Sequence, residues 1–337
     1  MLIAGPNLTI DRTSTLPELR PGEVLRVDGV QVTAGGKGLN VARAARALGH
    51  PAVLVGFVPG RVGEALAAMI ADEDIELVGV PIAGDLRSTA VLMEPGGRVT
   101  VVNEPGPSLA EGDWEAFERA LEGARAGHAV LACSGSVPPQ SPPDAYARLT
   151  RLARAHGLRC VVDVAGPALQ AALEAEPDLV APNLGEAEGV LEGRAGEAVE
   201  ASADARPRAE AAARGLVARG ARAALVTAAG AGAALAERGE PPADAAPARP
   251  PAPAGRAATR VIWLPAPTVT VRNPIGAGDA LVGALAAALE RGEPLAAAAR
   301  AGVAAGAASV EVPLAGDLDP ARWRALLDRL DTPGDSP

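Results

Sequence analysis

A carboxylate directly after a glycine-rich turn is the residue pattern that most plainly suggests chemistry. In the segment NPIGAGDALVGAL (273–285), Asp279 follows such a turn and precedes an apolar, helix-prone run. The turn consists of Gly276, Ala277 and Gly278. Free N–H groups at a helix start, together with the helix dipole, form a site for anions. A phosphate held there beside a carboxylate suits phosphoryl transfer, because the carboxylate can take the proton of the attacking hydroxyl. The alternative is an ordinary first-turn helix acid.

A second glycine turn, AGGKGLNVARA (34–44), carries the one lysine of the chain. Of the 31 basic residues 30 are Arg, so Lys37 is a residue type that the sequence otherwise avoids. The adjacent Gly35 and Gly36 let a ligand approach the backbone closely, and a compact ammonium beside them could hold a phosphate. Asn40, one of five Asn, follows in the same segment. The spacing is not that of a Walker A loop, and an ordinary turn before a helix is the alternative.

The segment PNLGEAE (182–188) pairs an amide with a carboxylate. Asn183 and Glu186 are three residues apart at an expected helix start, so they would share one face of the helix. Their oxygen atoms could hold Mg²⁺ directly or through its waters. The same spacing is also typical of a helix N-cap with a first-turn Glu, which is the structural alternative.

Two single residues could complete such a site. Asp11, after the first apolar run, could accept hydrogen bonds from substrate hydroxyls, or it could be a solvated turn acid. Arg87 precedes an expected hairpin and could grip a phosphate with two hydrogen bonds, or it could be one of many surface arginines. The three histidines show no metal-binding spacing, so we interpret them as structural.

The composition excludes several classes of protein. The net charge is −10 and aromatic residues make up 2% of the chain, which argues against nucleic acid or an anionic membrane as a partner. Cys133 and Cys160 are too few to staple a chain of 337 residues and indicate buried, reduced thiols. The sequence has neither a signal-peptide pattern nor an apolar run long enough to span a membrane. We therefore expect a cytoplasmic protein.

Apolar runs alternate with helix-prone segments along the chain. This alternation predicts an α/β protein with a doubly wound, mostly parallel sheet, which binds ligands beyond the carboxyl ends of its strands. The expected strands are 2–10, 52–58, 75–82, 129–135, 158–165, 179–183 and 223–230. The expected helices are 39–49, 63–73, 111–126, 142–157, 276–292 and 294–310.

Two segments do not fit this alternation. The stretch 11–32 and a hairpin around Gly96 and Gly97 within 85–104 have the alternating polarity of a small, separate sheet. We expect this sheet to lie off the main one, within one domain that spans 1–330. The Pro/Ala-rich stretch 238–259 is expected to be an exposed, flexible insertion, and 331–337 a tail.

Together these motifs resemble the PfkB, or ribokinase-like, family of carbohydrate kinases. The two glycine segments are similar to the N-terminal and C-terminal signatures of that family. Five shorter motifs occur in the same order, one before the first segment and four between the two. The shorter motifs are GPNLTID, NEPGP, CSGSVPP, VDVAG and PNLGE. GGKG followed by LNVAR, Arg87 and NEPGP look most like the 1-phosphofructokinase and tagatose-6-phosphate kinase branch.

This resemblance implies roles for the residues singled out above. Asp279 would be the catalytic base beside an anion hole of Gly276, Ala277 and Gly278. Asn183 and Glu186 would organise Mg²⁺. The residues that would hold sugar hydroxyls are Asp11, Gly35, Gly36 and Asn40. Lys37 and Arg87 would face the sugar phosphate. The residues beside the phosphates of ATP would be Thr227, Gly230 and Gly232. The small sheet would be the family's lid, which in many members also pairs two subunits into a homodimer.

The implied reaction is ATP- and Mg²⁺-dependent phosphorylation of a ketohexose phosphate: fructose 1-phosphate, tagatose 6-phosphate or fructose 6-phosphate. Two alternatives remain. One is a ribokinase- or nucleoside-kinase-like enzyme with an unphosphorylated acceptor, and the other is a catalytically silent sugar-phosphate-binding protein. The chain departs from the family pattern at Ala181, where a Lys is usual, and at Ala229, in the turn expected beside the nucleotide.

Overall fold

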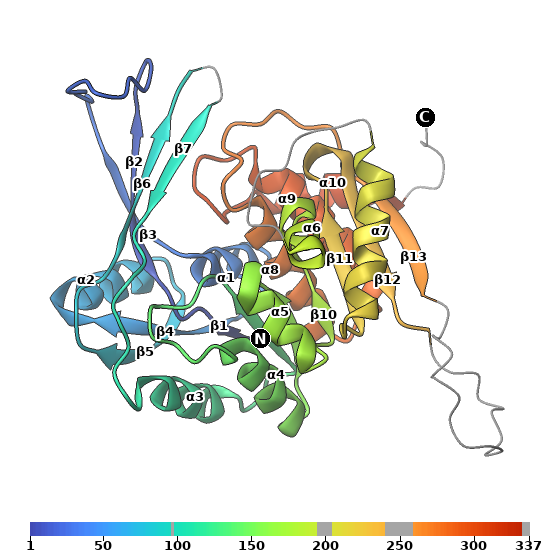
Figure 1. Ribbon diagram of the computed structural model, residues 1–337. Coiled ribbons are helices and arrows are strands. Elements are labelled where there is room, and N and C mark those ends of the chain that lie inside the picture. The colour runs from blue at the N-terminus through green and yellow to red at the C-terminus, as the bar shows by residue number, and fades with distance from the viewer. Residues whose placement is uncertain (96–97, 194–203, 240–258, 332–337) are drawn as a thin grey trace, which may run out of the picture.

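The computed structural model describes residues 1–95, 98–193, 204–239 and 259–331. These residues form a large central sheet with helices on both faces and a small second sheet that projects from it (Figure 1). The predicted α/β class with a mostly parallel sheet is confirmed. No helix of the described residues has the length and apolar character needed to cross a membrane.

The central sheet has nine strands within the described part of the chain, and its inner strands are parallel. In spatial order they are β13 (Arg260–Pro265), β12 (Gly232–Glu237), β11 (Ala223–Thr227), β10 (Leu179–Val180), β9 (Arg159–Asp163), β8 (Val130–Ser134), β1 (Leu2–Ala4), β4 (Val53–Pro59) and β5 (Glu76–Ile82). The last two strands on the β13 side pair antiparallel. The sequence analysis did not predict these two strands.

Helices cover both faces of the sheet, which therefore lies in the middle of three layers. On one face lie α3 (Asp113–Ala124), α4 (Ala145–Ala155), α5 (Gly166–Glu174), α6 (Leu184–Glu192) and α7 (Ala205–Ala218). On the other lie α1 (Lys37–Ala47), α2 (Gly60–Ala71), α8 (Ala277–Glu290) and α9 (Leu295–Ser309), and α10 (Pro320–Asp331) packs on α9.

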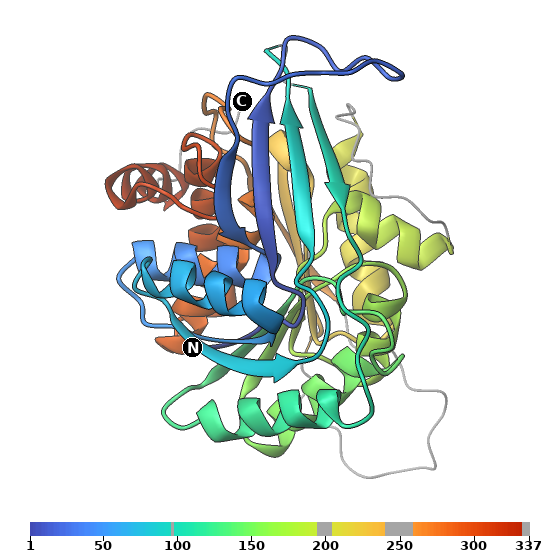
Figure 2. The same cartoon turned by 90° about the vertical axis from the view of Figure 1, so that its left-hand side faces the viewer.

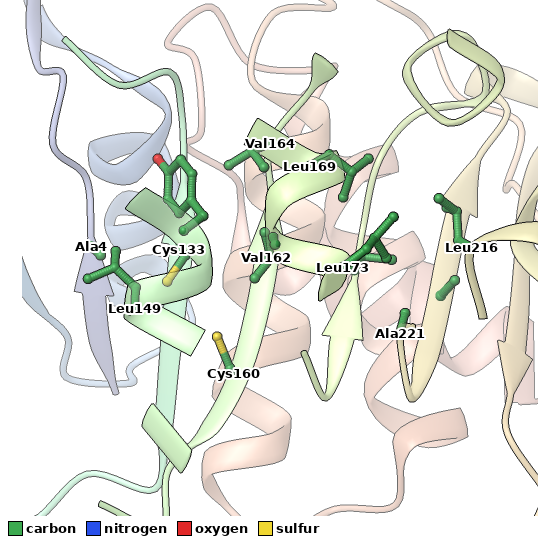
Figure 3. Close-up of a cluster of buried hydrophobic side chains, with 14 of the residues drawn as sticks. Ala4, Cys133, Leu149, Cys160, Val162, Val164, Leu169, Leu173, Leu216 and Ala221 are labelled. Atoms are coloured by element: carbon green, nitrogen blue, oxygen red, sulfur yellow. The ribbon is translucent and has the colours of Figure 1, made fainter. Parts of the chain in front are cut away.

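The strands are buried on both faces, and successive side chains point into different cores. In β1, Leu2 and Ala4 join one apolar cluster while Ile3 joins the other, as the period-two geometry of a strand requires. Figure 3 shows part of the first cluster, with Cys133 and Cys160 among aliphatic side chains. Both cysteines are free and buried, as the sequence analysis expected.

The small sheet has the strand order β3 (Gln31–Gly35), β2 (Thr9–Thr15), β6 (Ser88–Met93) and β7 (Val99–Asn103). It stands off the end of the central sheet (Figure 2). The hairpin of β6 and β7 is confirmed, although its tip at Gly96 and Gly97 lies outside the described residues. Residues 240–258 of the predicted insertion and 332–337 of the predicted tail lie outside them too.

The prediction of one strand over 2–10 is wrong. The chain leaves the central sheet after Ala4 and enters the small sheet at Thr9, so one apolar run supplies two strands. Asn7 fixes the segment that joins the two sheets, because its Nδ2 donates to the carbonyl of Pro105 at 3.1 Å and to Oγ of Ser136 at 3.0 Å. Asp11 consequently lies inside β2 and not at the end of the first strand.

Candidate active site

The first turn of α8 has the geometry of an anion site. Gly276 caps the helix with φ 83°, in the left-handed region, and an added Cβ would lie 2.5 Å from the backbone nitrogen of Gly316. Glycine is therefore required there for both its conformation and its lack of a side chain. The next residues, Ala277 and Gly278, open the helix, so their N–H groups have no partner within it.

Asn273 shapes the loop that leads into this turn. Its Oδ1 accepts from the backbone N–H of Ile275 at 3.0 Å, and its Nδ2 donates to the carbonyl of Pro313 at 2.8 Å. The side chain thus ties the loop before α8 to the loop after α9. This explains why the amide precedes the glycine turn in the sequence.

Asp279 lies in this first turn and is 95% buried. Burial raises the pKa of its carboxyl to about 7, although the charge of Lys37 and a hydrogen bond from Asn40 oppose the shift. The nearby carboxylates of Asp163 and Glu186 add to the rise. A carboxyl with a pKa near neutrality is suited to accept and release a proton under physiological conditions.

Lys37 begins α1 and lies between two carboxylates. Its Nζ is 3.6 Å from Oδ1 of Asp163 and 3.8 Å from Oε1 of Glu186. Asp163 ends β9, and its Oδ2 accepts from Oγ of Ser134 at 2.9 Å. The sequence analysis did not single out Asp163 as a site residue. The motif VDVAG, which places an acid at the carboxyl end of a buried strand, was the signal that could have identified it.

Asn183 and Glu186 form a capping box at the start of α6. The backbone N–H of Glu186 donates to Oδ1 of Asn183, and the backbone N–H of Asn183 donates to Oε2 of Glu186, both at 2.9 Å. The structural alternative from the sequence is therefore present. It leaves Oε1 of Glu186 facing Lys37.

The oxygen atoms of this region fit a hydrated divalent cation. Asp163 and Glu186 place two buried carboxylates beside one ammonium, which gives an excess of negative charge. Mg²⁺ keeps several waters and takes few direct carboxylate ligands. Among the described residues, no group of three or more His, Cys, Asp and Glu is arranged to hold a metal ion by itself.

Asp11 lines a small pocket of about 30 Å³ between the small sheet and the central domain, together with Thr33, Arg43, Asn273 and Ala315 among others. Its Oδ1 is buried and has no hydrogen-bond partner. Burial raises the pKa of Asp11 to about 6, while Arg43 and Arg87 oppose this. A Cβ on Gly35 would lie 2.2 Å from Oδ2 of Asp11, which explains the glycine at that position.

Arg87 lies where the chain enters and leaves the small sheet. Its guanidinium donates to the backbone carbonyls of Asn7 (2.8 Å), Leu8 (3.3 Å) and Glu104 (3.2 Å). The structure thus places Arg87 at the junction of the small sheet with the central domain, where its charge also acts on Asp11.

The residues predicted beside the nucleotide lie at the end of β11. Thr227 forms an isolated bridge with Asn183, which brings this turn next to α6. Gly230 lies in a short 3₁₀ turn, η1 (Ala229–Ala231), and Gly232 begins β12 with φ 133°. Ala229 has φ 47°, a left-handed conformation that is unusual for alanine. Ala181 is buried in the core at the end of β10.

Comparison with known proteins matches the description "pfkB family carbohydrate kinase" over residues 7–322. The chain is 32% identical to the 1-phosphofructokinase of Rhodobacter capsulatus over 296 residues, which cover 87% of this chain and 85% of that protein. Among solved structures it is similar to phosphofructokinase-2 from Escherichia coli in complex with potassium, with a TM-score of 0.82 and 26% identity. The complex of that enzyme with fructose-6-phosphate gives a TM-score of 0.80 at the same identity. In both cases 98% of this chain and 99% of the other are covered.

The chain therefore belongs to the PfkB family of carbohydrate kinases. It is a sugar kinase of the phosphofructokinase type, and the family implies ATP as the phosphoryl donor. The resemblance inferred from the two glycine segments is confirmed, including its phosphofructokinase branch.

Proposed function

We propose that this kinase phosphorylates a ketohexose phosphate, with fructose 1-phosphate as the preferred substrate and Asp279 as the general base. The observation that carries the proposal is the buried Asp279 carboxyl in the first turn of α8, beside free backbone N–H groups. The relative that is a 1-phosphofructokinase supports the choice of substrate. Tagatose 6-phosphate and fructose 6-phosphate are the other members of the same substrate class.

In the proposed reaction, a sugar hydroxyl lies beside Asp279 and attacks the γ-phosphorus of ATP. A new P–O bond forms as the bond between the β- and γ-phosphates breaks, the hydroxyl proton passes to Asp279, and ADP leaves. The N–H groups at Gly276, Ala277 and Gly278 stabilise the negative charge that develops on the transferred group. Mg²⁺, when bound, would neutralise phosphate charge, and Asn183 and Glu186 would hold it through water.

The sugar would bind beside the small pocket that Asp11 lines. The unpartnered Oδ1 of Asp11 is placed to accept from a hydroxyl, and Gly35 and Gly36 would let the ring lie against the backbone. Asn40 lies next to this cavity and adjoins Asp279. Thr227, Gly230 and Gly232 would lie beside the phosphates of ATP.

Lys37 and Arg87 have different surroundings, so we assign them different roles. Lys37 lies beside Glu186 and Asp163, a position that favours contact with the transferred phosphoryl group. Arg87, at the junction of the small sheet with the central domain, would bind the phosphate that the sugar already carries. That Lys37 also contacts this phosphate stays a prediction. Discrimination against an unphosphorylated sugar or a nucleoside would then depend chiefly on Arg87.

The small sheet would act as a lid that excludes water when the sugar binds. Its face opposite the cavity carries a row of residues across β3, β2, β6 and β7, namely Val32, Arg12, Ala90 and Val102. Val32 and Val102 are 45% and 57% exposed. We propose that this row pairs with the same row of a second copy to form a homodimer.

The test of this function is ADP release from MgATP with a panel of acceptors. The panel comprises fructose 1-phosphate, fructose 6-phosphate, tagatose 6-phosphate, fructose, ribose and adenosine. We expect the highest kcat/KM with fructose 1-phosphate. Turnover with ribose or adenosine alone would replace this proposal with the unphosphorylated acceptor. Binding of sugar phosphates without turnover on any acceptor would support the silent binding protein.

A further inference from the structure

A fully buried arginine lies behind the candidate base, and the proposed reaction assigns it no role. Arg43 is 99% buried in α1, one helical turn after Asn40. Its Nε and Nη2 donate to the two carboxylate oxygens of Glu73, both at 2.6 Å. Its Nη2 also donates to the carbonyl of Ala34 at 2.7 Å, directly before the glycine pair of the turn.

The remaining nitrogen of Arg43 determines how the amide of Asn40 is oriented. Nη1 donates to Oδ1 of Asn40 at 2.9 Å. A guanidinium has no acceptor, so only the carbonyl oxygen of the amide can face it. The Nδ2 of Asn40 must then point the other way, and it donates to Oδ2 of Asp279 at 2.8 Å.

This chain of contacts distinguishes the two oxygens of Asp279. Oδ2 is occupied by the Nδ2 of Asn40, which can only donate. A proton taken from a substrate would therefore go to Oδ1. If the amide of Asn40 were free to rotate, its oxygen could face Oδ2, and that contact would favour the protonated acid, which cannot act as a base.

Glu73 makes the burial of Arg43 tolerable. An unpaired guanidinium in the core would be strongly unfavourable, and two hydrogen bonds to a carboxylate compensate its charge. Glu73 follows α2 and its side chain is 22% exposed, so it joins the solvent-facing end of the network to the buried end. The network runs from Glu73 through Arg43 and Asn40 to Asp279.

We infer that Arg43 is a positioning residue of the kinase: held by Glu73, it fixes the amide of Asn40 so that Oδ1 of Asp279 is the oxygen that receives the substrate proton. The inference rests on the proposed role of Asp279. It adds a residue from the buried part of α1 to the machinery of the reaction. It also explains why an arginine is buried three residues after Asn40.

The test is kcat and its pH profile for Arg43→Lys, which keeps the charge but loses the fork that spans Glu73, Asn40 and Ala34. We expect kcat to fall about 10- to 100-fold, with KM for the sugar phosphate changed less than about threefold. We also expect the acid limb of the profile to move to higher pH, because the bond from Asn40 that lowers the pKa of Asp279 is weakened. The groups facing that carboxyl, Lys37, Asp163 and Glu186, are unchanged in this variant.

A double-mutant cycle shows whether Arg43 acts through Asn40. Asn40→Ala alone should lower kcat to a similar extent, and adding Arg43→Lys to it should lower kcat little further. If the two losses multiply, Arg43 acts by another route and the inference is overturned. It is also overturned if Arg43→Lys has the kcat and acid limb of the wild type.

One further variant is a control for this test, and another replaces Arg43→Lys if that variant does not fold. Arg148→Lys is the matched control, because Arg148 grips Glu118 with the same two-nitrogen fork between α4 and α3 and its hydrogen bonds reach no site residue. Its kcat should equal that of the wild type. If Arg43→Lys does not fold, Glu73→Gln at the rim carries the test. It should lower kcat several-fold and move the acid limb upward, and an unchanged profile overturns the inference.

Asp279→Asn separates this inference from the proposed function. If Asp279→Asn retains turnover, the general-base proposal and the inference fail together. If Asp279→Asn is inactive while Arg43→Lys matches the wild type, only the inference about Arg43 fails.

Discussion

At the scale of single residues, the site keeps two carboxylates away from water although burial disfavours their charged forms. The pKa of Asp279 is raised to about 7 and that of Asp11 to about 6, in both cases mainly by desolvation. Structural acids of folded proteins usually show the opposite shift because they are ion-paired or hydrogen-bonded. Raised values in a cleft are typical of groups that exchange protons or bind ligands.

The pKa of Asp279 predicts how activity depends on pH. A general base must be ionised, so kcat should fall as the pH drops through about 7 and should level off above about 8. The measurement is kcat at saturating substrate across this range, with the enzyme shown to remain folded. A kcat that stays constant down to about pH 5 would contradict the assignment.

Burial of the ionised Asp279 carboxylate should also lower the free energy of unfolding at high pH. Because the folded-state pKa of Asp279 is raised, the folded state binds the proton more tightly, and this contribution to stability is lost as the pH rises through about 7. Asp279→Asn, which is neutral and of the same shape, should therefore be more stable than the wild type at pH 8, by on the order of 3 kcal/mol. The gain should disappear near pH 4. Urea unfolding at the two pH values measures it, and a variant that is less stable at pH 8 would refute this explanation.

The sequence identified the residues that lie on distinctive turns, and it missed those that look ordinary. Asp279 and Lys37 stand beside glycines, so local pattern was sufficient. Arg43 is one of 30 arginines, and only folding brings it to Glu73, 30 residues away. The bond between Asn40 and Asp279 spans 239 residues. Such contacts depend on tertiary packing, which a single sequence does not display.

At the scale of elements, the close contact of α1 and α8 brings Asn40 to Asp279. The two helices approach at Gly283, where a Cβ would lie 2.6 Å from the carbonyl oxygen of Val41 and 2.8 Å from Cβ of Ala44. Gly38 packs against Gly5 of the central domain in the same way, with a Cβ distance of 2.7 Å to its Cα. Small residues therefore set the distance between the base and its hydrogen-bond donor.

Gly283→Ala should separate these helices. The added methyl meets backbone, which cannot move aside, so we expect a loss of about 1 to 3 kcal/mol of unfolding free energy and about a tenfold fall in kcat. The matched control is Gly123→Ala in α3, where a Cβ meets nothing within 4 Å. That change should stabilise the protein slightly, because alanine favours helix. Equal effects of the two substitutions on unfolding and kcat would show that helix propensity, not contact, decides the outcome.

The periodicity of the sequence predicted α1, α2, α3, α4, α8 and α9 and the inner strands of the large sheet. It failed for 2–10, because one apolar run serves two sheets and only Gly5 and Pro6 mark the change. It did not find β12, whose residues are mostly small, or β13, a short apolar run after the Pro/Ala-rich stretch. It also did not find α5, α7 and α10. Weakly patterned segments take their structure from neighbours that are distant in sequence.

At the scale of the whole molecule, the small sheet presents two different faces. One face lines the cavity with Asp11, Thr13 and Thr33, and the other carries the row that includes Val32 and Val102. A sheet that stands off the body has both faces available. The hydroxyl and carboxyl groups of the first face suit a sugar, and the exposed valines of the other row suit a second copy of the chain.

The proposed homodimer predicts that a charge in this row reduces association. Val102→Asp should shift the molecular mass measured by sedimentation from dimer toward monomer, because two like charges would meet across a symmetric interface. Val62→Asp on α2, where Val62 is 49% exposed, is the control and should remain dimeric. A wild type that is monomeric at high protein concentration would exclude the lid dimer.

The whole account depends on Asp279 as the base of a sugar-phosphate kinase. The most direct measurement compares the wild type with Asp279→Asn for ADP release on fructose 1-phosphate and, by calorimetry, for binding of that sugar. We predict that kcat falls by at least about 1,000-fold while Kd for the sugar changes less than about threefold. A variant that keeps more than about a tenth of the wild-type kcat would contradict the central claim.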